Sequence, residues 1–171
     1  MKHIFIIILF VLSGIMYFQG KVLLRGSGYG ILDIEFASKQ KTAEIVQSWH
    51  ELSEGDQQLV TIARRNTYTD FWFIPVYVLL IVTLSNARMQ REQRYWLNEL
   101  LRLNLLLGVL AGSLDVIENL MLLHNFHYPG IAETCYSTQY VAGGKFGILA
   151  FVLSVYVFSL AVPKNGSIHT R

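Results

Sequence analysis

The chain has 171 residues, of which 53% are hydrophobic and only 15% are charged, and its formal net charge is +2. Because soluble domains carry about 25% charged residues, this composition excludes an ordinary soluble enzyme and indicates a membrane protein. The small net charge gives no basis for a nucleic-acid partner, and the single cysteine, Cys135, excludes an internal disulfide and a cysteine-rich metal site.

Four apolar blocks along the chain predict four transmembrane helices, since a span needs about 20 residues. The blocks cover about residues 3–20, 68–87, 103–123 and 141–162. We therefore expect residues 1–171 to form one all-α domain, a four-helix transmembrane bundle with an extracytoplasmic cap formed by residues 21–67. A cleaved signal peptide is the alternative for the first block, but no small-x-small cleavage site follows it, so we predict a retained anchor.

The cap is expected to be an amphipathic helical segment lying on the outer surface of the bundle. Residues 31–37, ILDIEFA, alternate apolar and acidic side chains and predict a short strand or extended segment. Ser38 is a suitable N-cap for a helix that continues to about His50. Ser53, followed by two acidic residues, predicts the start of a second helix that leads towards the second span.

Lysine and arginine residues in the short segments outside the predicted spans lie on one side of the bundle; the long first loop also carries six, but at roughly fifty residues it is near the limit at which such charges set orientation. The N-terminus, the connection between the second and third spans, and the C-terminal tail together carry Lys2, Arg88, Arg91, Arg94, Arg102, Lys164 and Arg171. The connection between the third and fourth spans, residues 124–140, carries none. Short loops rich in lysine and arginine stay in the cytoplasm, so both termini are predicted to be cytoplasmic.

The third span contains the motif DVIEN, which places Asp115, Glu118 and Asn119 on one face of a helix. Gly108 and Gly112 continue this face and form a small-x-x-x-small pattern that lets another helix approach closely. An acid at the centre of a span costs about 2.5–3.5 kcal/mol on insertion scales, whereas each leucine returns about 0.3–0.6 kcal/mol. The acids are therefore expected to face the bundle, where they form a functional site or hold helices together.

Polar residues of the other spans are predicted to lie at the same depth as this motif. Asp70 and Tyr77 belong to the second span, Lys145 to the fourth, and Asp33 to the cap above. Lys145 is expected either to pair with Glu118 or Asp115 or to extend to the membrane interface. The sequence thus predicts that polar groups converge in the outer half of the bundle.

Histidines provide a weaker alternative for the same region. His124 and His127 follow the third span, and His50 lies in the cap. With a carboxylate they would resemble a zinc site of the histidine and carboxylate type, but their spacing matches no specific metal motif. We predict no metal and no cofactor.

Three segments, GYGILDIEFA, NTYTDFWFIPVY and DVIEN, resemble a group of small bacterial four-span membrane proteins. This resemblance covers most of the chain and implies a location in the bacterial inner (plasma) membrane, but it supplies no activity. More remotely, the layout is similar to the EXPERA family of sterol isomerases and the sigma-2 receptor, in which buried acids face an apolar ligand. That resemblance implies that Asp33, Asp70 and Asp115 or Glu118 are loose counterparts of those acids.

We therefore predict an acidic pocket that binds, or binds and acts on, a lipid-like small molecule. Asp115 and Glu118 are the expected acid/base pair. Asp70, Tyr77, Asn119, Lys145 and Asp33 are the expected ligand-binding residues, with Lys145 holding an anionic head group. Two alternatives are a non-catalytic accessory or assembly subunit, bound to a membrane protein partner or to a second copy, and a protein that moves protons or ions.

Overall fold

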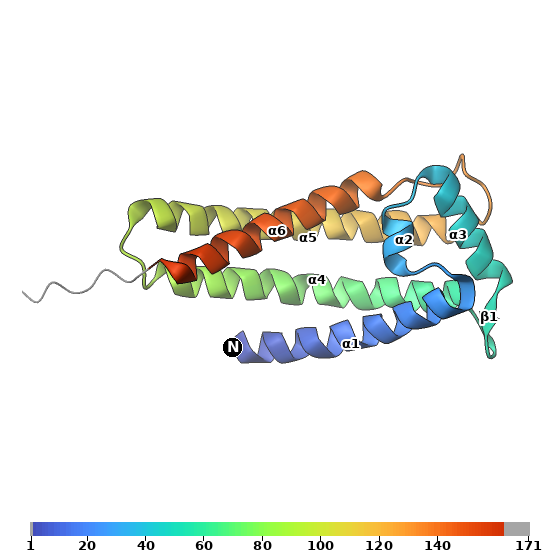
Figure 1. Ribbon diagram of the computed structural model, residues 1–171, viewed down its shortest axis with the longest axis horizontal. Helices are drawn as coiled ribbons and strands as arrows, with labels where there is room; N and C mark the ends of the chain where they lie inside the picture. Colours follow the sequence, from blue (N-terminus) through green and yellow to red (C-terminus); the bar gives the residue numbers. More distant parts are fainter. Residues whose placement is uncertain (1, 163–171) are drawn as a thin grey trace, which may run out of the picture.

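The computed structural model describes residues 2–162 (Figure 1). In this part of the chain, the elements follow in the order α1 (Lys2–Ser27), α2 (Ile31–Glu35), α3 (Lys39–Glu51), β1 (Ser53–Glu54), β2 (Gln57–Gln58), α4 (Leu59–Met89), α5 (Tyr95–Asn125) and α6 (Gln139–Ala161). The predicted all-α four-helix bundle is confirmed. Lys164, Arg171 and the side chain of Lys2, which contributed to the predicted orientation, lie outside the described residues.

The four long helices α1, α4, α5 and α6 are each long and apolar enough to cross a membrane, so the chain is a multi-pass membrane protein. α1 packs against α4, α4 against α5, and α5 against α6, in the order seen in Figure 1. α4 and α5 have 31 residues each. At 1.5 Å per residue they are roughly 46 Å long, well beyond the hydrocarbon core of about 30 Å. Their ends therefore extend past the apolar part of a bilayer.

Close packing between α4 and α5 confirms the small-residue stripe predicted for the third span. A Cβ atom on Gly112 would lie 2.7 Å from Val78 Cγ2, and one on Gly108 would lie 2.9 Å from Ile81 Cγ2. Both distances are too short for a side chain, so only glycine permits this approach of the two helices. α4 continues through Pro75 without ending there.

The cap lies at one end of the bundle, called the cap end below, and its first part differs from the prediction. Residues 31–37 do not form a strand or extended segment, because α2 is a short helix. Ile34 is fully buried in the core of the cap. The hydroxyl of Thr138, just before α6, donates to the carbonyl oxygens of Ile34 (3.1 Å) and Glu35 (2.8 Å). These bonds fasten α2 over the cap end of α6.

α3 forms as predicted, with Ser38 as its N-cap. The Ser38 hydroxyl accepts a hydrogen bond from the backbone N–H of Lys41 at 3.4 Å. The apolar face of α3 packs into a core in which Trp49 and Phe126 are fully buried. The Trp49 indole N–H donates to Ser27 Oγ at 2.8 Å, which ties α3 to the end of α1.

The predicted second cap helix at Ser53 is wrong. A two-stranded hairpin occupies this position, with Ser53 opposite Gln58 and a left-handed glycine, Gly55, in the turn (φ +61°). The left-handed conformation at Gly55 favours a tight turn over a helix start. α4 therefore begins at Leu59, about nine residues before the predicted second span, and Leu59 is fully buried in the cap core.

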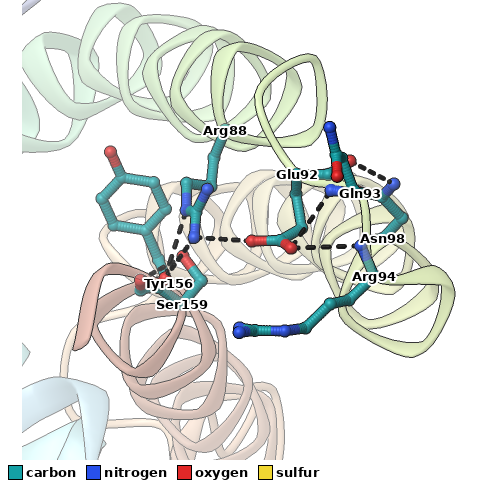
Figure 2. A network of polar contacts seen from close by, with 7 residues as sticks. All are labelled: Arg88, Glu92, Gln93, Arg94, Asn98, Tyr156 and Ser159. Atoms are coloured by element: carbon teal, nitrogen blue, oxygen red, sulfur yellow. Dashed lines mark hydrogen bonds and ion pairs between the residues drawn. The ribbon is translucent and has the colours of Figure 1, made fainter. Parts of the chain in front are cut away.

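At the opposite end of the bundle, a polar network joins the α4–α5 connection to the end of α6 (Figure 2). The Arg88 guanidinium donates to Ser159 O at 2.7 and 3.1 Å and pairs with Glu92 at 2.8 Å. The other oxygen of Glu92 accepts from the backbone N–H groups of Gln93 and Arg94, both at 3.1 Å. Because the last carbonyl groups of a helix lack partners within it, Arg88 satisfies one such group of α6.

Candidate functional site

Lys145 is the centre of a buried group of charges at the cap end of the membrane-spanning helices. Its Nζ lies 2.8 Å from Glu118 Oε2, 3.0 Å from Asp115 Oδ1 and 3.9 Å from Glu35 Oε2. Of the two expectations for this residue, pairing with acids therefore holds, and extension to the membrane interface does not. Lys145 joins α6 to α5 and to the cap at a single point.

α4 contributes to this group through two hydrogen bonds to α5. The Tyr77 hydroxyl donates to Asp115 Oδ2 at 3.1 Å, and the Asn119 amide donates to Asp70 Oδ2 at 2.6 Å. Asp70 is partly buried, while Tyr77, Asp115 and Asn119 are buried. We call the following residues the cap-end cluster: Glu35, Asp70, Tyr77, Asp115, Glu118, Asn119 and Lys145.

The cap contributes Glu35 to the cluster, whereas the sequence analysis predicted Asp33 as the cap residue of the site. Asp33 is exposed, and its carboxylate accepts from the backbone N–H of Gly30 at 2.6 Å, which caps the start of α2. An extended segment would turn both acids to the same side, but on a helix residues two apart face different directions. The helical form of α2 therefore separates them and sends only Glu35 to Lys145.

Beside the cluster lies a cavity of about 780 Å³. Most of its wall is apolar and comes from α1, α4 and α6, with Met16, Phe73 and Phe146 among the lining side chains. At the cap end it meets the carboxyl groups of Glu35, Asp70 and Asp115, the Tyr77 hydroxyl and the Lys145 ammonium, and Asp33 lies at its rim. The cavity is thus mostly apolar, with polar groups at its cap end.

Charges within the cluster do not balance. Four carboxyl groups, on Glu35, Asp70, Asp115 and Glu118, face one ammonium group on Lys145. Glu118 is fully buried, and the ammonium group of Lys145, 2.8 Å from its Oε2, is also approached by Asp115 and Glu35. Buried charges are stable only when they are paired, so the cluster needs protons or a further cation.

Glu35 is the acid of the cluster that lies outside the membrane-spanning helices. Burial is the main cause that raises the pKa of Glu35 to about 8; the Lys145 ammonium opposes this rise, and the carboxylates of Glu118, Asp70 and Asp115 contribute to it. Near neutral pH this carboxyl group therefore carries a proton when the cavity is empty. The proton removes one of the uncompensated negative charges.

The histidines do not meet one another. His50 Nε2 contacts Phe126 O at 3.0 Å, His124 Nε2 contacts Thr134 O at 3.2 Å, and His127 Nδ1 contacts Leu123 O at 2.8 Å. Among residues 2–162, no group of three or more histidine, cysteine, aspartate or glutamate side chains is placed to hold a metal ion.

The structure therefore brings together six of the seven residues predicted for the site, leaves Asp33 at the rim, and adds Glu35. Comparison of the chain with models of protein families, with curated proteins and with solved structures found no match.

Proposed function

We propose that this protein binds a lipid-like amphiphile whose head group is a cation. One observation carries the proposal: an apolar cavity ends at a buried cluster in which carboxyl groups outnumber the ammonium group by four to one. An apolar chain of the ligand would occupy the cavity, and its head group would supply the positive charge that the cluster lacks.

The size and position of the cavity support a membrane lipid as the ligand. Its volume of about 780 Å³ is within the range of about 300–1,000 Å³ typical of small-molecule pockets. On α1 its lining runs from Leu9 to Leu24, a distance of roughly 22 Å at 1.5 Å per residue. α1 packs mainly against α4 and not against α6, although both α1 and α6 line the cavity. This arrangement favours access from the bilayer, between α1 and α6.

The surroundings of Lys145 favour a cationic head group over an anionic one. Its ammonium group lies within 4 Å of three carboxyl groups, so an added anion would face those acids as well as the lysine. The carboxylates of Asp115 and Glu118, which both pair with Lys145, accept hydrogen bonds and cannot donate them to an anion. We therefore propose that Lys145 is an internal counter-ion, in place of the predicted role as an anion-binding residue.

Binding is the proposed activity, and the acid/base pair of Asp115 and Glu118 stays a prediction. Both acids are held in the ion pairs of Lys145, and Asp115 accepts the hydroxyl of Tyr77 as well. This fixed geometry is suited to recognising a charge at one position. A reaction would need a ligand bond within hydrogen-bond distance of one of these carboxyl groups.

The experiment is a binding measurement in lipid nanodiscs with three probes of equal chain length: dodecylamine, dodecyltrimethylammonium and dodecanoate. We expect dodecylamine to bind at least tenfold more tightly than dodecanoate. Asp115→Asn and Glu118→Gln should each weaken dodecylamine binding by at least tenfold, whereas Glu133→Gln, an exposed acid outside the cluster, should have no effect. Equal binding of dodecanoate and dodecylamine, or no binding of either, would contradict the proposal.

The accessory-subunit alternative is supported by one feature of α6. Gly143 and Gly147 are exposed, one helical turn apart, and no atom lies within 4 Å of a Cβ built on either. Such a face permits close approach of a helix from a partner. Native mass spectrometry of the gently solubilised protein tests this alternative, because a stoichiometric second chain, lost on Gly143→Leu, would favour it.

We further propose that the cap faces outward and that both termini are cytoplasmic, in the inner (plasma) membrane of a bacterium. The arginines of the α4–α5 connection support this orientation. Cysteines introduced at the exposed residues Gln57 and Gln93 would report it. A membrane-impermeant maleimide added to intact cells is expected to label the first variant and not the second, since Cys135 is buried.

A further inference from the structure

Glu35 differs from the other acids of the cap-end cluster in how firmly it is held. Asp115 is bound on both oxygens, by Lys145 and Tyr77, and Asp70 accepts the Asn119 amide. Glu118 lies 2.8 Å from Lys145. Glu35 lies farther from Lys145, at 3.9 Å, and its carboxyl group also meets that of Glu118. Its charge is the least compensated of the three acids around this lysine.

Glu35 is also the most exposed of the three acids around Lys145. The exposed fraction of its side chain is 12%, compared with 6% for Asp115 and 1% for Glu118. It lies on α2, in the cap, whereas the other acids belong to the membrane-spanning helices α4 and α5. It also lines the cavity directly. A proton leaving Glu35 therefore has a short path to solvent, and the vacated charge faces the ligand.

We infer that Glu35 exchanges its proton for the cationic head group, so that the protein releases a proton into solution when the ligand binds. This inference rests on the proposed function and specifies which residue loses a proton and how many protons are released per ligand. In the exchange, the O–H bond of the Glu35 carboxyl group breaks and the proton passes to water. The ligand ammonium keeps its own protons and pairs with the resulting carboxylate. The charge inside the site is therefore the same before and after the exchange, and the released proton carries one positive charge into solution.

The groups facing Glu35 explain the direction of the exchange. Asp70 on α4, Asp115 and Glu118 on α5, and Lys145 on α6 interact with it. Three of these carry carboxyl groups and only one carries a positive charge, so an ionised Glu35 is disfavoured in the empty site. A bound cation reverses this balance. With a pKa of about 8, about nine-tenths of the Glu35 carboxyl groups are protonated at pH 7 before the ligand arrives.

The first test counts protons. Dodecylamine is titrated calorimetrically into the protein in nanodiscs at pH 7, in two buffers with different ionisation enthalpies, and empty nanodiscs provide the blank. We expect the wild type to release about 0.9 proton per ligand. Glu35→Gln, which cannot exchange a proton, should release less than half as many. Glu44→Gln, the same substitution at an exposed acid of α3, should match the wild type.

The second test uses only the wild-type protein and does not depend on a variant that folds. Dodecylamine remains a cation from pH 6 to pH 8, so its affinity should be about 50-fold higher at pH 8 than at pH 6 if one carboxyl group near pKa 8 must lose a proton. Affinity that is constant over this range, or equal proton release by Glu35→Gln and the wild type, would overturn the inference and leave the proposed function standing. Failure of dodecylamine to bind at every pH would contradict the proposed function itself.

Discussion

The two ends of the bundle each contain a buried ionic group, and the two groups are built differently. At the opposite end, Arg88 pairs with Glu92, and both also hydrogen-bond to backbone groups, Arg88 to Ser159 O and Glu92 to the N–H groups of Gln93 and Arg94. At the cap end, four carboxyl groups face the single ammonium group of Lys145 beside a cavity. A balanced network holds helices together, whereas an unbalanced one next to an apolar cavity is a candidate binding site.

The largest effect on stability is expected from Lys145→Met, which leaves the acids of the cap-end cluster without their counter-ion. Removing one partner of a buried ion pair costs about 3–5 kcal/mol, and here one ammonium serves several acids. We expect the free energy of unfolding, measured by denaturant titration in detergent, to fall by that amount. The double variant Lys145→Met/Glu118→Gln should recover part of the loss. A single variant as stable as the wild type would show that the cluster is already neutral.

Arg88→Met tests the structural role of the opposite end. The substitution removes the charged donor to Ser159 O, and hydrogen bonds that involve a charged group contribute about 1.5–3 kcal/mol. The free energy of unfolding should fall by this amount while dodecylamine binding stays within twofold of the wild type. Arg91→Met, at an exposed arginine of the same connection, is the matched control. Lost binding in Arg88→Met without lost stability would remove the distinction between the two ends.

Gly112→Val tests whether the contact between α4 and α5 sets the geometry of the cap-end cluster. The new side chain would collide with Val78, and overpacking typically costs about 1–3 kcal/mol. Because the two helices would separate, the bonds from Tyr77 to Asp115 and from Asn119 to Asp70 should weaken, and dodecylamine affinity should fall with stability. Gly143→Val, where no atom lies within 4 Å, should change the stability of the isolated protein very little.

The smallest effect is expected at the opposite end when the pH is lowered from 9 to 5. The backbone N–H of Arg94 lowers the pKa of Glu92 below 4.5, and Arg88 lowers it further. A group with a lowered pKa contributes stability above its unfolded-state value and loses it only as the pH falls through the lowered value. Hydrogen exchange of residues 88–98, corrected for intrinsic rates, should therefore stay constant over this range. A change of more than threefold would contradict this expectation.

Residues 31–37 provide the contrast in the same experiment. Because the pKa of Glu35 is raised to about 8, the docked position of α2 is stabilised fully below about pH 4.5 and loses that contribution as the pH rises through 8. Protection of this segment in the empty protein should therefore decrease between pH 5 and pH 9. The pKa shifts of Glu35 and Glu92 thus have opposite signs, and only that of Glu35 is expected to affect protection between pH 5 and pH 9.

Much of the membrane domain could be predicted from the sequence because its signals are local. The apolar blocks predict the spans, and the helical spacing of Asp115, Glu118 and Asn119 predicts one polar face. Ser38 predicts the start of α3 because an N-cap acts on the turn that follows it. Each of these inferences needs only residues that are close in the chain.

The predictions that were wrong concern parts of the structure that depend on contacts between segments distant in the chain. The alternation in residues 31–37 favours a strand, but Thr138, about a hundred residues away, fixes α2 as a helix and selects Glu35 over Asp33. The polar residues Arg64 and Asn66 hide the early start of α4 from a hydropathy window. In the structure they contact Phe126 O and Met16 O, respectively. The cavity depends on where α1 packs, which no local pattern in the sequence reports.

The pairing of Lys145 with Asp115 and Glu118 also bears on how the chain enters the membrane during synthesis. The ribosome delivers α5, with both acids, before it delivers α6 with their counter-ion, and only a short connection separates the two helices. Alone, α5 would carry two costly acids into the bilayer. Insertion of α5 and α6 as a helical hairpin, with the salt bridge already formed, avoids that intermediate. The salt bridges of Lys145 with Asp115 and Glu118 therefore favour insertion of α5 and α6 as one unit.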